Sequence, residues 1–248
     1  EKGMAVLYWE RAKEQYGVTM PVVRAMEEKG IVKLESMRIY RDPLDLMISR
    51  SNQKQEEVKM QTGRDFFLNE EQQLAVQTIL KEWDQKDKSV YLLHGVTGSG
   101  KTEVYMELID FVRKQGKQAI FLIPEIALTY QMVLRFYQRF GSRVSILHSR
   151  MSAGERYDQY EKAKNGEIDI MIGPRSALFT PFSNLGIIII DEEHEESYKS
   201  ETVPRYHARE TAQRRAEMEG AKLILGSATP SVESYYRAEK GEYCLLEM

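Results

Sequence analysis

The sequence has only one cysteine, Cys244, among its 248 residues. A single cysteine excludes an internal disulfide and a cysteine-based zinc cluster, and it is typical of proteins from a reducing cytoplasm. No apolar run approaches the roughly 20 residues of a membrane-spanning helix, so we expect no membrane partner. An excess of positive charge is also missing, because 35 Lys and Arg stand against 38 Asp and Glu, a net charge of -3. This balance excludes a histone-like basic coat but allows a local basic groove.

Residues 1–44 predict a small winged-helix domain. Apolar residues at helical spacing from Ala5 to Tyr16 predict one helix, and Thr19 with Pro21 predicts the capped start of a second, which ends at Gly30. Residues 31–40 predict two short strands, and the polar residues 45–62 predict a linker. Duplex-DNA contact and a structural or protein-binding role both stay open for this domain. The chain begins with neither an initiator methionine nor a signal-type segment, so we expect a piece of a longer protein.

Residues 63–248 alternate between strand and helix patterns. This alternation predicts an α/β fold with a mainly parallel sheet that is covered by helices on both faces. The predicted strands are Ser89–His94, Gln118–Ile123, Val144–His148, Ile168–Ile172, Ile187–Ile190, Leu223–Leu225 and Cys244–Leu246. The predicted helices are Leu68–Lys81, Lys101–Lys114, Ile126–Phe140, Ala153–Asn165, Arg209–Glu219 and Val232–Glu239.

Residues 95–102 match the phosphate-loop pattern G-x-x-x-x-G-K-[ST] between a predicted strand and a predicted helix. Glycines let the backbone turn its N–H groups toward phosphates, and the helix start adds a positive dipole end. We expect Lys101 to neutralise the β- and γ-phosphates of ATP and Thr102 to hold Mg²⁺. The alternative, a glycine-rich turn that matches by chance, is disfavoured by the flanking elements. The predicted nucleotide-binding loop comprises Gly95, Val96, Thr97, Gly98, Ser99, Gly100, Lys101 and Thr102.

Two carboxylates follow the four isoleucines 187–190, which suit a central parallel strand. Ligands of open α/β sheets bind at the carboxyl ends of the strands. We therefore expect Asp191 to hold Mg²⁺ and Glu192 to orient or deprotonate the attacking water. The alternative is the acidic start of a helix. His194 is a candidate for the same site, with a purely structural histidine as its alternative.

Several strings carry a family resemblance. Residues 95–102, 191–194 and 226–231 resemble motifs I, II and III of superfamily 2 helicases. Longer strings resemble the PriA family of bacterial replication-restart helicases: GVTGSGKTEVY (95–105), PEIALT (124–129), RSALFTPFSNLG (175–186), DEEH (191–194), RYHAR (205–209) and GSATPS (226–231). The resemblance covers nearly the whole chain, and it implies that residues 63–248 form the first RecA-like, ATP-binding lobe of a P-loop NTPase.

The resemblance implies further site residues. Gln72 would read the adenine edge, although it could equally be a surface helix residue. Pro124 and Glu125 look like motif Ia, and Arg175 and Ser176 look like motif Ib, and both motifs would touch the DNA backbone. The hydroxyls of motif III would link the ATP site to the DNA site, their alternative being a simple turn before Pro230. Those hydroxyls belong to Ser227 and Thr229.

Residues 195–208 form a polar segment with Tyr198, Tyr206 and His207, directly after the carboxylates. Exposed aromatic side chains can stack single-stranded bases of any sequence. The segment resembles the aromatic-rich loop of PriA and RecQ-type helicases, which would report DNA occupancy to the ATP site. The alternative is that Tyr206 and His207 pack against the sheet.

The activity that the resemblance implies is an ATP- and Mg²⁺-dependent 3′-to-5′ DNA helicase at stalled or abandoned replication forks. Its partners would be single-stranded and forked DNA, primosome and helicase-loading proteins, and single-stranded DNA-binding protein, in the nucleoid-associated bacterial cytoplasm. Zinc, the arginine finger and a second lobe would belong to the rest of the parent protein, so we expect this chain alone to hydrolyse almost no ATP. The alternatives are another superfamily 2 translocase, such as an RNA helicase, and a nucleotide-gated DNA-binding module.

Overall fold

The computed structural model describes residues 7, 9–34, 68–85 and 89–248. The chain divides into two compact units, Glu1–Ile39 and Tyr40–Met248, and each is considered by itself.

The first unit contains the two predicted helices, α1 (Trp9–Tyr16) and α2 (Met20–Glu28). Thr19 occupies the predicted N-cap position of α2, but its side chain makes no capping hydrogen bond. Residues 31–34 form no strand. The rest of the predicted ribbon and the whole linker, 45–62, lie outside the described residues, so the winged-helix assignment stays a prediction.

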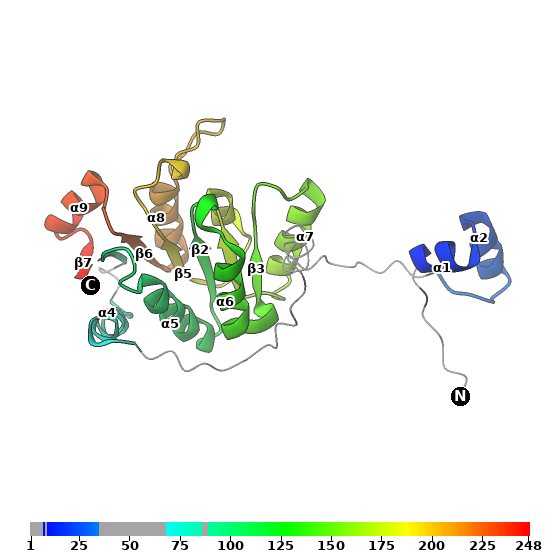
Figure 1. Cartoon of the computed structure of the whole chain (residues 1–248), viewed down its shortest axis with the longest axis horizontal. Helices are drawn as coiled ribbons and strands as arrows, with labels where there is room; N and C mark the ends of the chain where they lie inside the picture. Colours follow the sequence, from blue (N-terminus) through cyan, green and yellow to red (C-terminus); the bar gives the residue numbers. More distant parts are fainter. Residues whose placement is uncertain (1–6, 8, 35–67, 86–88) are drawn as a thin grey trace. The chain divides into compact units, whose positions relative to one another are not determined.

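The second unit is built on one seven-stranded parallel sheet, in the order β3-β4-β2-β5-β6-β1-β7. All seven predicted strands are confirmed, with ends that differ by one or two residues. Figure 1 shows the strands in the middle of the unit. Their bounds are β1 Val90–His94, β2 Gln118–Leu122, β3 Val144–Ile146, β4 Ile170–Gly173, β5 Leu185–Ile190, β6 Lys222–Ser227 and β7 Cys244–Glu247.

Helices cover both faces of this sheet, as predicted (Figure 1). Side chains alternate between the faces of a strand, so Tyr91 and Leu93 pack under one helical layer while Val90 and Leu92 pack under the other. The first layer comprises α4 (Glu70–Lys81), α5 (Lys101–Lys114) and α6 (Tyr130–Phe140). The second comprises α7 (Ala153–Lys164), α8 (Ala208–Glu219) and α9 (Val232–Glu239).

One predicted helix start is wrong. The helix expected from Ile126 begins only at Tyr130, where the Thr129 hydroxyl accepts a hydrogen bond from the Met132 backbone N–H at 3.3 Å. Glu125–Ala127 form a separate 3₁₀ turn. Across the described ranges, no helix combines the length and the apolar character that crossing a bilayer requires.

Asp169, just before β4, joins the end of α5 to the starts of β2 and β3. Its carboxylate accepts hydrogen bonds from Arg143 Nε at 2.9 Å and Arg113 Nε at 3.3 Å. Its backbone carbonyl accepts from the Ala119 N–H at 2.8 Å. Burial opposes ionisation of Asp169, but the hydrogen bonds and charges of the two arginines outweigh it and hold the pKa of this carboxyl below its usual value.

Asp169→Asn should therefore destabilise the chain at pH 7, by roughly the 1–3 kcal/mol of a lost charge-assisted hydrogen bond. Because the folded pKa is depressed, this stabilisation is full above about pH 4, the unfolded pKa, and disappears as the pH falls through the folded value. Thermal melting of both proteins at pH 7 and near pH 3 checks this. Asp110→Asn, which removes an ion pair between a half-buried carboxylate and the exposed ammonium of Lys114, is the control and should change little at either pH. An equal loss from Asp169→Asn at both pH values would contradict the assignment.

Candidate active site

The phosphate loop connects β1 to α5 at the carboxyl edge of the sheet. Gly98 and Gly100 have φ values of +85° and +86°, which glycine adopts without strain. A Cβ at Gly100 would also lie 2.1 Å from Gln72 Nε2. The loop therefore needs glycine at Gly100 both for its backbone conformation and for its close approach to α4.

The interior of the loop suits a polyphosphate. Lys101 is 7% exposed, and its ammonium donates to the Gly95 carbonyl at 2.7 Å. The buried Ser99 hydroxyl has no hydrogen-bond partner in the described part of the chain. A buried hydroxyl without a partner is costly, and a phosphate oxygen would satisfy it. The loop thus offers a cation, a free hydroxyl and the start of a fourteen-residue helix to an anion.

Gln72 supports this loop. It is 8% exposed, so the surface-residue alternative is wrong. Its Oε1 accepts from the Asn69 N–H at 2.9 Å in a capping box, and its Nε2 donates to the Ser99 carbonyl at 2.9 Å. Both ends of the amide are engaged within the chain, while the predicted reading of adenine stays a prediction.

Asp191 emerges from β5 and faces α5. Its Oδ1 accepts from the Tyr105 hydroxyl at 3.0 Å, and its backbone carbonyl accepts from the Tyr198 hydroxyl at 2.6 Å. Burial, followed by the charge of Glu192, raises the pKa of Asp191 to about 6. Thr102 lies three residues before Tyr105 in α5, so the two side chains share one face of the helix. Thr102 is therefore on the side of α5 that carries Tyr105, while a magnesium ion shared with Asp191 stays a prediction.

Glu192 has a left-handed backbone, with φ +48°. This conformation is uncommon for a residue other than glycine, and it is found where the surrounding structure holds it. The Glu192 carboxylate lies 3.7 Å from His194 Nδ1.

His194 joins motif II to motif III. Its Nδ1 lies 2.7 Å from Ser227 Oγ, and its Nε2 lies 3.4 Å from Thr229 Oγ1. The Ser227 carbonyl in turn accepts from the Gly95 N–H of the phosphate loop at 3.1 Å. The three motifs are therefore contiguous, and His194 lies against motif III. Whether these hydroxyls carry a signal to a DNA site stays a prediction.

Among the interactions of motif II that the sequence does not predict, two involve residues of the strings that carry the resemblance. One is the hydrogen bond from Tyr105. The other is a buried ion pair between Glu193 and Arg209, whose Nη1–Oε2 distance is 2.9 Å. The strings that contain Tyr105, Glu193 and Arg209 carry the resemblance, but residues so far apart along the chain give no signal of their pairing.

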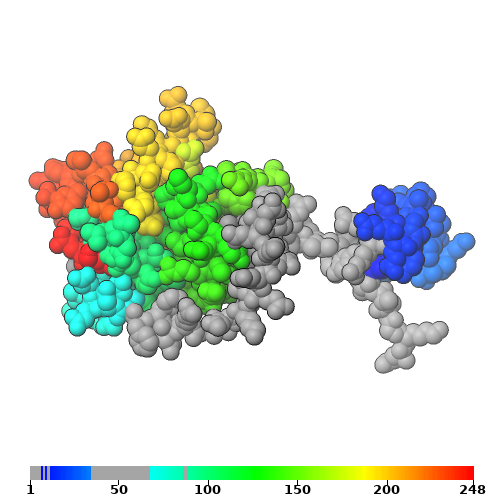
Figure 2. Space-filling view, in the orientation of Figure 1, coloured from blue at the N-terminus to red at the C-terminus, as the bar shows by residue number. Residues whose placement is uncertain are grey.

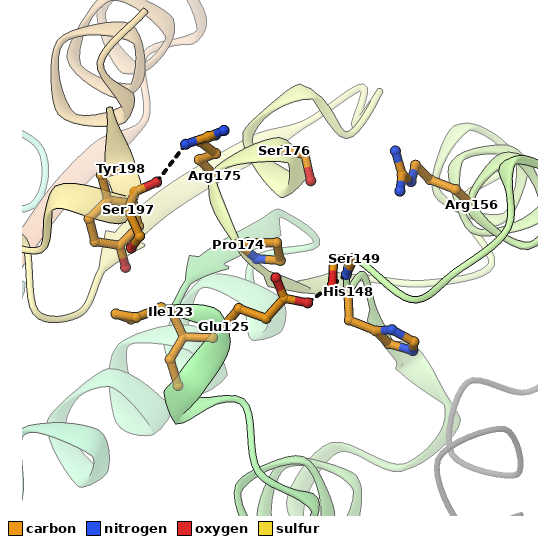
Figure 3. A pocket seen from close by; sticks show the side chains of 11 residues that line it. Ile123, Glu125, His148, Ser149, Arg156, Pro174, Arg175, Ser176, Ser197 and Tyr198 are labelled. Carbon is orange, nitrogen blue, oxygen red and sulfur yellow. Dashed lines mark hydrogen bonds between the residues drawn. The ribbon is translucent and has the colours of Figure 1, made fainter. Parts of the chain in front are cut away.

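A pocket of about 320 Å³ opens beside this site, where motifs Ia and Ib meet (Figure 3). Glu125 Oε1 accepts from the Ser149 N–H at 2.7 Å, and Arg175 Nη1 donates to the carbonyls of Ser197 and Lys199 at 2.9 and 2.7 Å. The predicted residues of both motifs are thus brought together, while their contact with DNA stays a prediction. The lining comprises Ile123, Pro124, Glu125, His148, Ser149, Arg156, Pro174, Arg175, Ser176, Ser197 and Tyr198.

The aromatic segment between β5 and α8 projects from the lobe (Figures 1 and 2), and its three predicted stacking residues differ in burial and in their contacts. Tyr198 as an exposed platform is wrong, because it is 1% exposed and bonded to Asp191. His207 instead caps α8, where its Nδ1 accepts from the Arg209 N–H at 3.3 Å. Tyr206 is half-buried and contacts the 53% exposed Phe179 edge to face, at 5.2 Å between ring centroids. The available aromatic surface is therefore the pair of Tyr206 and Phe179, of which Phe179 was not predicted.

Comparison with known proteins shows the family of the chain. Residues 65–232 match the ResIII family, described as the type III restriction enzyme, res subunit. The chain is 48% identical over 227 residues to the replication restart protein PriA of Bacillus subtilis, covering 91% of this chain and 27% of that protein. It is 41% identical over 219 residues to PriA of Haemophilus influenzae, covering 88% and 29%. The chain thus spans about a quarter of the length of these relatives.

Solved structures show the same fold. RecG bound to a three-way DNA junction aligns with a TM-score of 0.55 and 24% identity, over 74% of this chain and 24% of that one. The helicase domain of Hef from Pyrococcus furiosus aligns with a TM-score of 0.50 and 15% identity, over 71% and 37%. The α/β fold and the resemblance inferred from the motifs are both confirmed. The chain belongs to the ResIII family, and it is similar to the replication restart proteins PriA over most of its length.

Proposed function

We propose that this chain is the ATP-binding lobe of a DNA helicase that acts at stalled or abandoned replication forks and moves 3′ to 5′. The observation that supports this most directly is the contiguity of three motifs at one edge of the sheet, beside a pocket lined by motifs Ia and Ib. The names of the relatives support replication restart, and the neighbour solved with a three-way DNA junction supports forked DNA as the substrate.

Each residue of the site has a chemical role in this proposal. Lys101 leaves the Gly95 carbonyl and neutralises the β- and γ-phosphates. Thr102 and Asp191 would hold Mg²⁺, which would neutralise charge on the phosphates when bound. Glu192 orients the attacking water and takes its proton. His194 couples this site to motif III through its contacts with Ser227 and Thr229.

The residues that line the pocket have roles in binding DNA in this proposal. Pro124, Glu125, Arg175 and Ser176 line the path of a single strand, and the pair of Tyr206 and Phe179 stacks a base at its border. Primosome and helicase-loading proteins and single-stranded DNA-binding protein would be the partners, in the bacterial cytoplasm at the nucleoid.

The rival functions are an RNA helicase and a nucleotide-gated binding module. ATPase rates of the full-length protein on forked DNA, single-stranded DNA and RNA separate them. Only the fork helicase favours the forked substrate.

Glu192→Gln in the full-length protein should keep the affinity for ATP and Mg²⁺ and lose nearly all turnover, because the amide cannot take a proton from water. Lys101→Ala should instead weaken nucleotide binding, since it removes the cation that faces the phosphates. Equilibrium binding of a fluorescent nucleotide and steady-state ATPase rates measure the two effects. Glu196→Gln, which changes an exposed carboxylate four residues away, is the control and should do neither. Normal turnover by Glu192→Gln would refute the assigned role.

Tyr206→Ala should lower the stimulation of ATPase activity by single-stranded DNA and leave the DNA-free rate nearly unchanged. Stacking of a base on an aromatic ring contributes about 1–3 kcal/mol, so the DNA affinity should fall about tenfold. DNA titration of the ATPase rate measures both quantities. Tyr236→Ala, at a 55% exposed tyrosine on α9, is the control and should be stimulated normally. If Tyr206→Ala only lowers the melting temperature, the residue packs the segment and does not bind DNA.

A further inference from the structure

The Glu193 side chain is a fully buried carboxylate with four hydrogen-bond donors around it. Oε1 accepts from the Ser231 N–H at 2.6 Å. Oε2 accepts from Arg209 Nη1 at 2.9 Å and from the hydroxyls of Ser231 and Ser234 at 3.1 and 2.9 Å. Burying a carboxylate is costly unless it is paired and hydrogen-bonded, so this complete set of donors holds Glu193 in one place.

Arg209 connects Glu193 to the aromatic segment. It is the second residue of α8, which begins directly after that segment. Its Nη1 also donates to Ser231 Oγ at 2.6 Å and to Ser234 Oγ at 3.2 Å, both at the start of α9. Motif II, the end of the aromatic segment and the start of α9 therefore meet at one buried ion pair.

The aromatic segment contacts the two residues that flank Glu192 in the sequence, Asp191 and Glu193. At one end, the Tyr198 hydroxyl donates to the backbone carbonyl of Asp191. At the other, Arg209 binds the Glu193 carboxylate. The backbones of Asp191 and Glu193 are also held by hydrogen bonds. The Asp191 N–H donates to the Leu122 carbonyl at 2.9 Å, and the Glu193 N–H donates to the Gly226 carbonyl at 3.0 Å.

Glu192 itself adopts its left-handed conformation between these two anchors. Such a conformation persists only where the surroundings hold it, and here the anchors are the residues immediately before and after it. We propose that Glu193, through its ion pair with Arg209, is a positioning residue. It orients the Glu192 carboxylate, and this orientation depends on the conformation of the aromatic segment. This inference rests on the role proposed above for Glu192.

The decisive variant is Glu193→Gln in the full-length protein, which keeps the size of the side chain and removes its charge. We expect the DNA-stimulated kcat to fall about tenfold to a hundredfold, the cost of a misplaced catalytic group. The KM for ATP and the affinity for a fluorescent nucleotide should stay within about twofold, because ground-state binding is not altered. The ratio of the rates with and without DNA should fall as well, because the link to the segment is broken.

Two further variants keep the test decisive. Ser234→Ala removes one of the four donors and should lower kcat in the same direction by a smaller factor, even if Glu193→Gln folds poorly. Arg214→Gln, at an exposed arginine of α8, the helix that carries Arg209, is the control and should behave as the wild type. Rates are divided by the concentration of nucleotide-binding sites, so a loss of folded protein does not lower them.

The outcomes separate this inference from the proposed function. Loss of turnover in Glu192→Gln together with a normal kcat per site in Glu193→Gln and Ser234→Ala would overturn the inference and leave the proposed function intact. Normal turnover in Glu192→Gln would overturn both. A fall in nucleotide affinity at unchanged kcat would show that Glu193 supports binding and would also overturn the inference.

Discussion

The register of three parallel strands determines where every reactive group of this lobe lies. Leu225 of β6 is paired with Ile190 of β5 on one side and with Leu92 of β1 on the other. This pairing places Asp191 beside Gly226 and brings the phosphate loop level with Ser227. A slip of one residue would turn every side chain of a strand to the opposite face. A slip would also draw Asp191 toward the position of Ile190, which is fully buried, and burying a carboxylate there is costly.

Motif III contributes space as well as hydroxyls. A Cβ at Gly226 would lie 1.6 Å from the Tyr105 hydroxyl and 3.4 Å from Asp191 Oδ1. Only a residue without a side chain allows the tyrosine from α5 to pass over β6 and reach the carboxylate at the end of β5. The glycine of motif III therefore couples the helix of motif I to the aspartate of motif II.

The sequence predicted the parts of this structure that depend on local pattern. Continuous apolar runs marked the strands, and the glycines with Lys101 marked the phosphate loop. The burial of single residues could not be predicted in this way. A tyrosine can be exposed or buried, and Tyr198 lies under Asp191 with its hydroxyl on the Asp191 carbonyl. The bonds of Glu193 to Arg209 and Ser231 join residues 16 and 38 positions apart. No periodicity connects such residues, so only the fold reveals that they meet.

The hydrogen bond from the Lys101 ammonium to the Gly95 carbonyl has a consequence for the affinity of the loop for nucleotides. Nucleotide binding is an exchange of oxygen partners for this lysine, and the measured affinity contains only the difference between a neutral carbonyl and a charged phosphate. The gain from the exchange grows with the negative charge of the incoming group. We therefore expect the loop to favour highly charged phosphate chains over neutral or singly charged ligands, because a weak anion cannot compete with the carbonyl that the protein itself supplies.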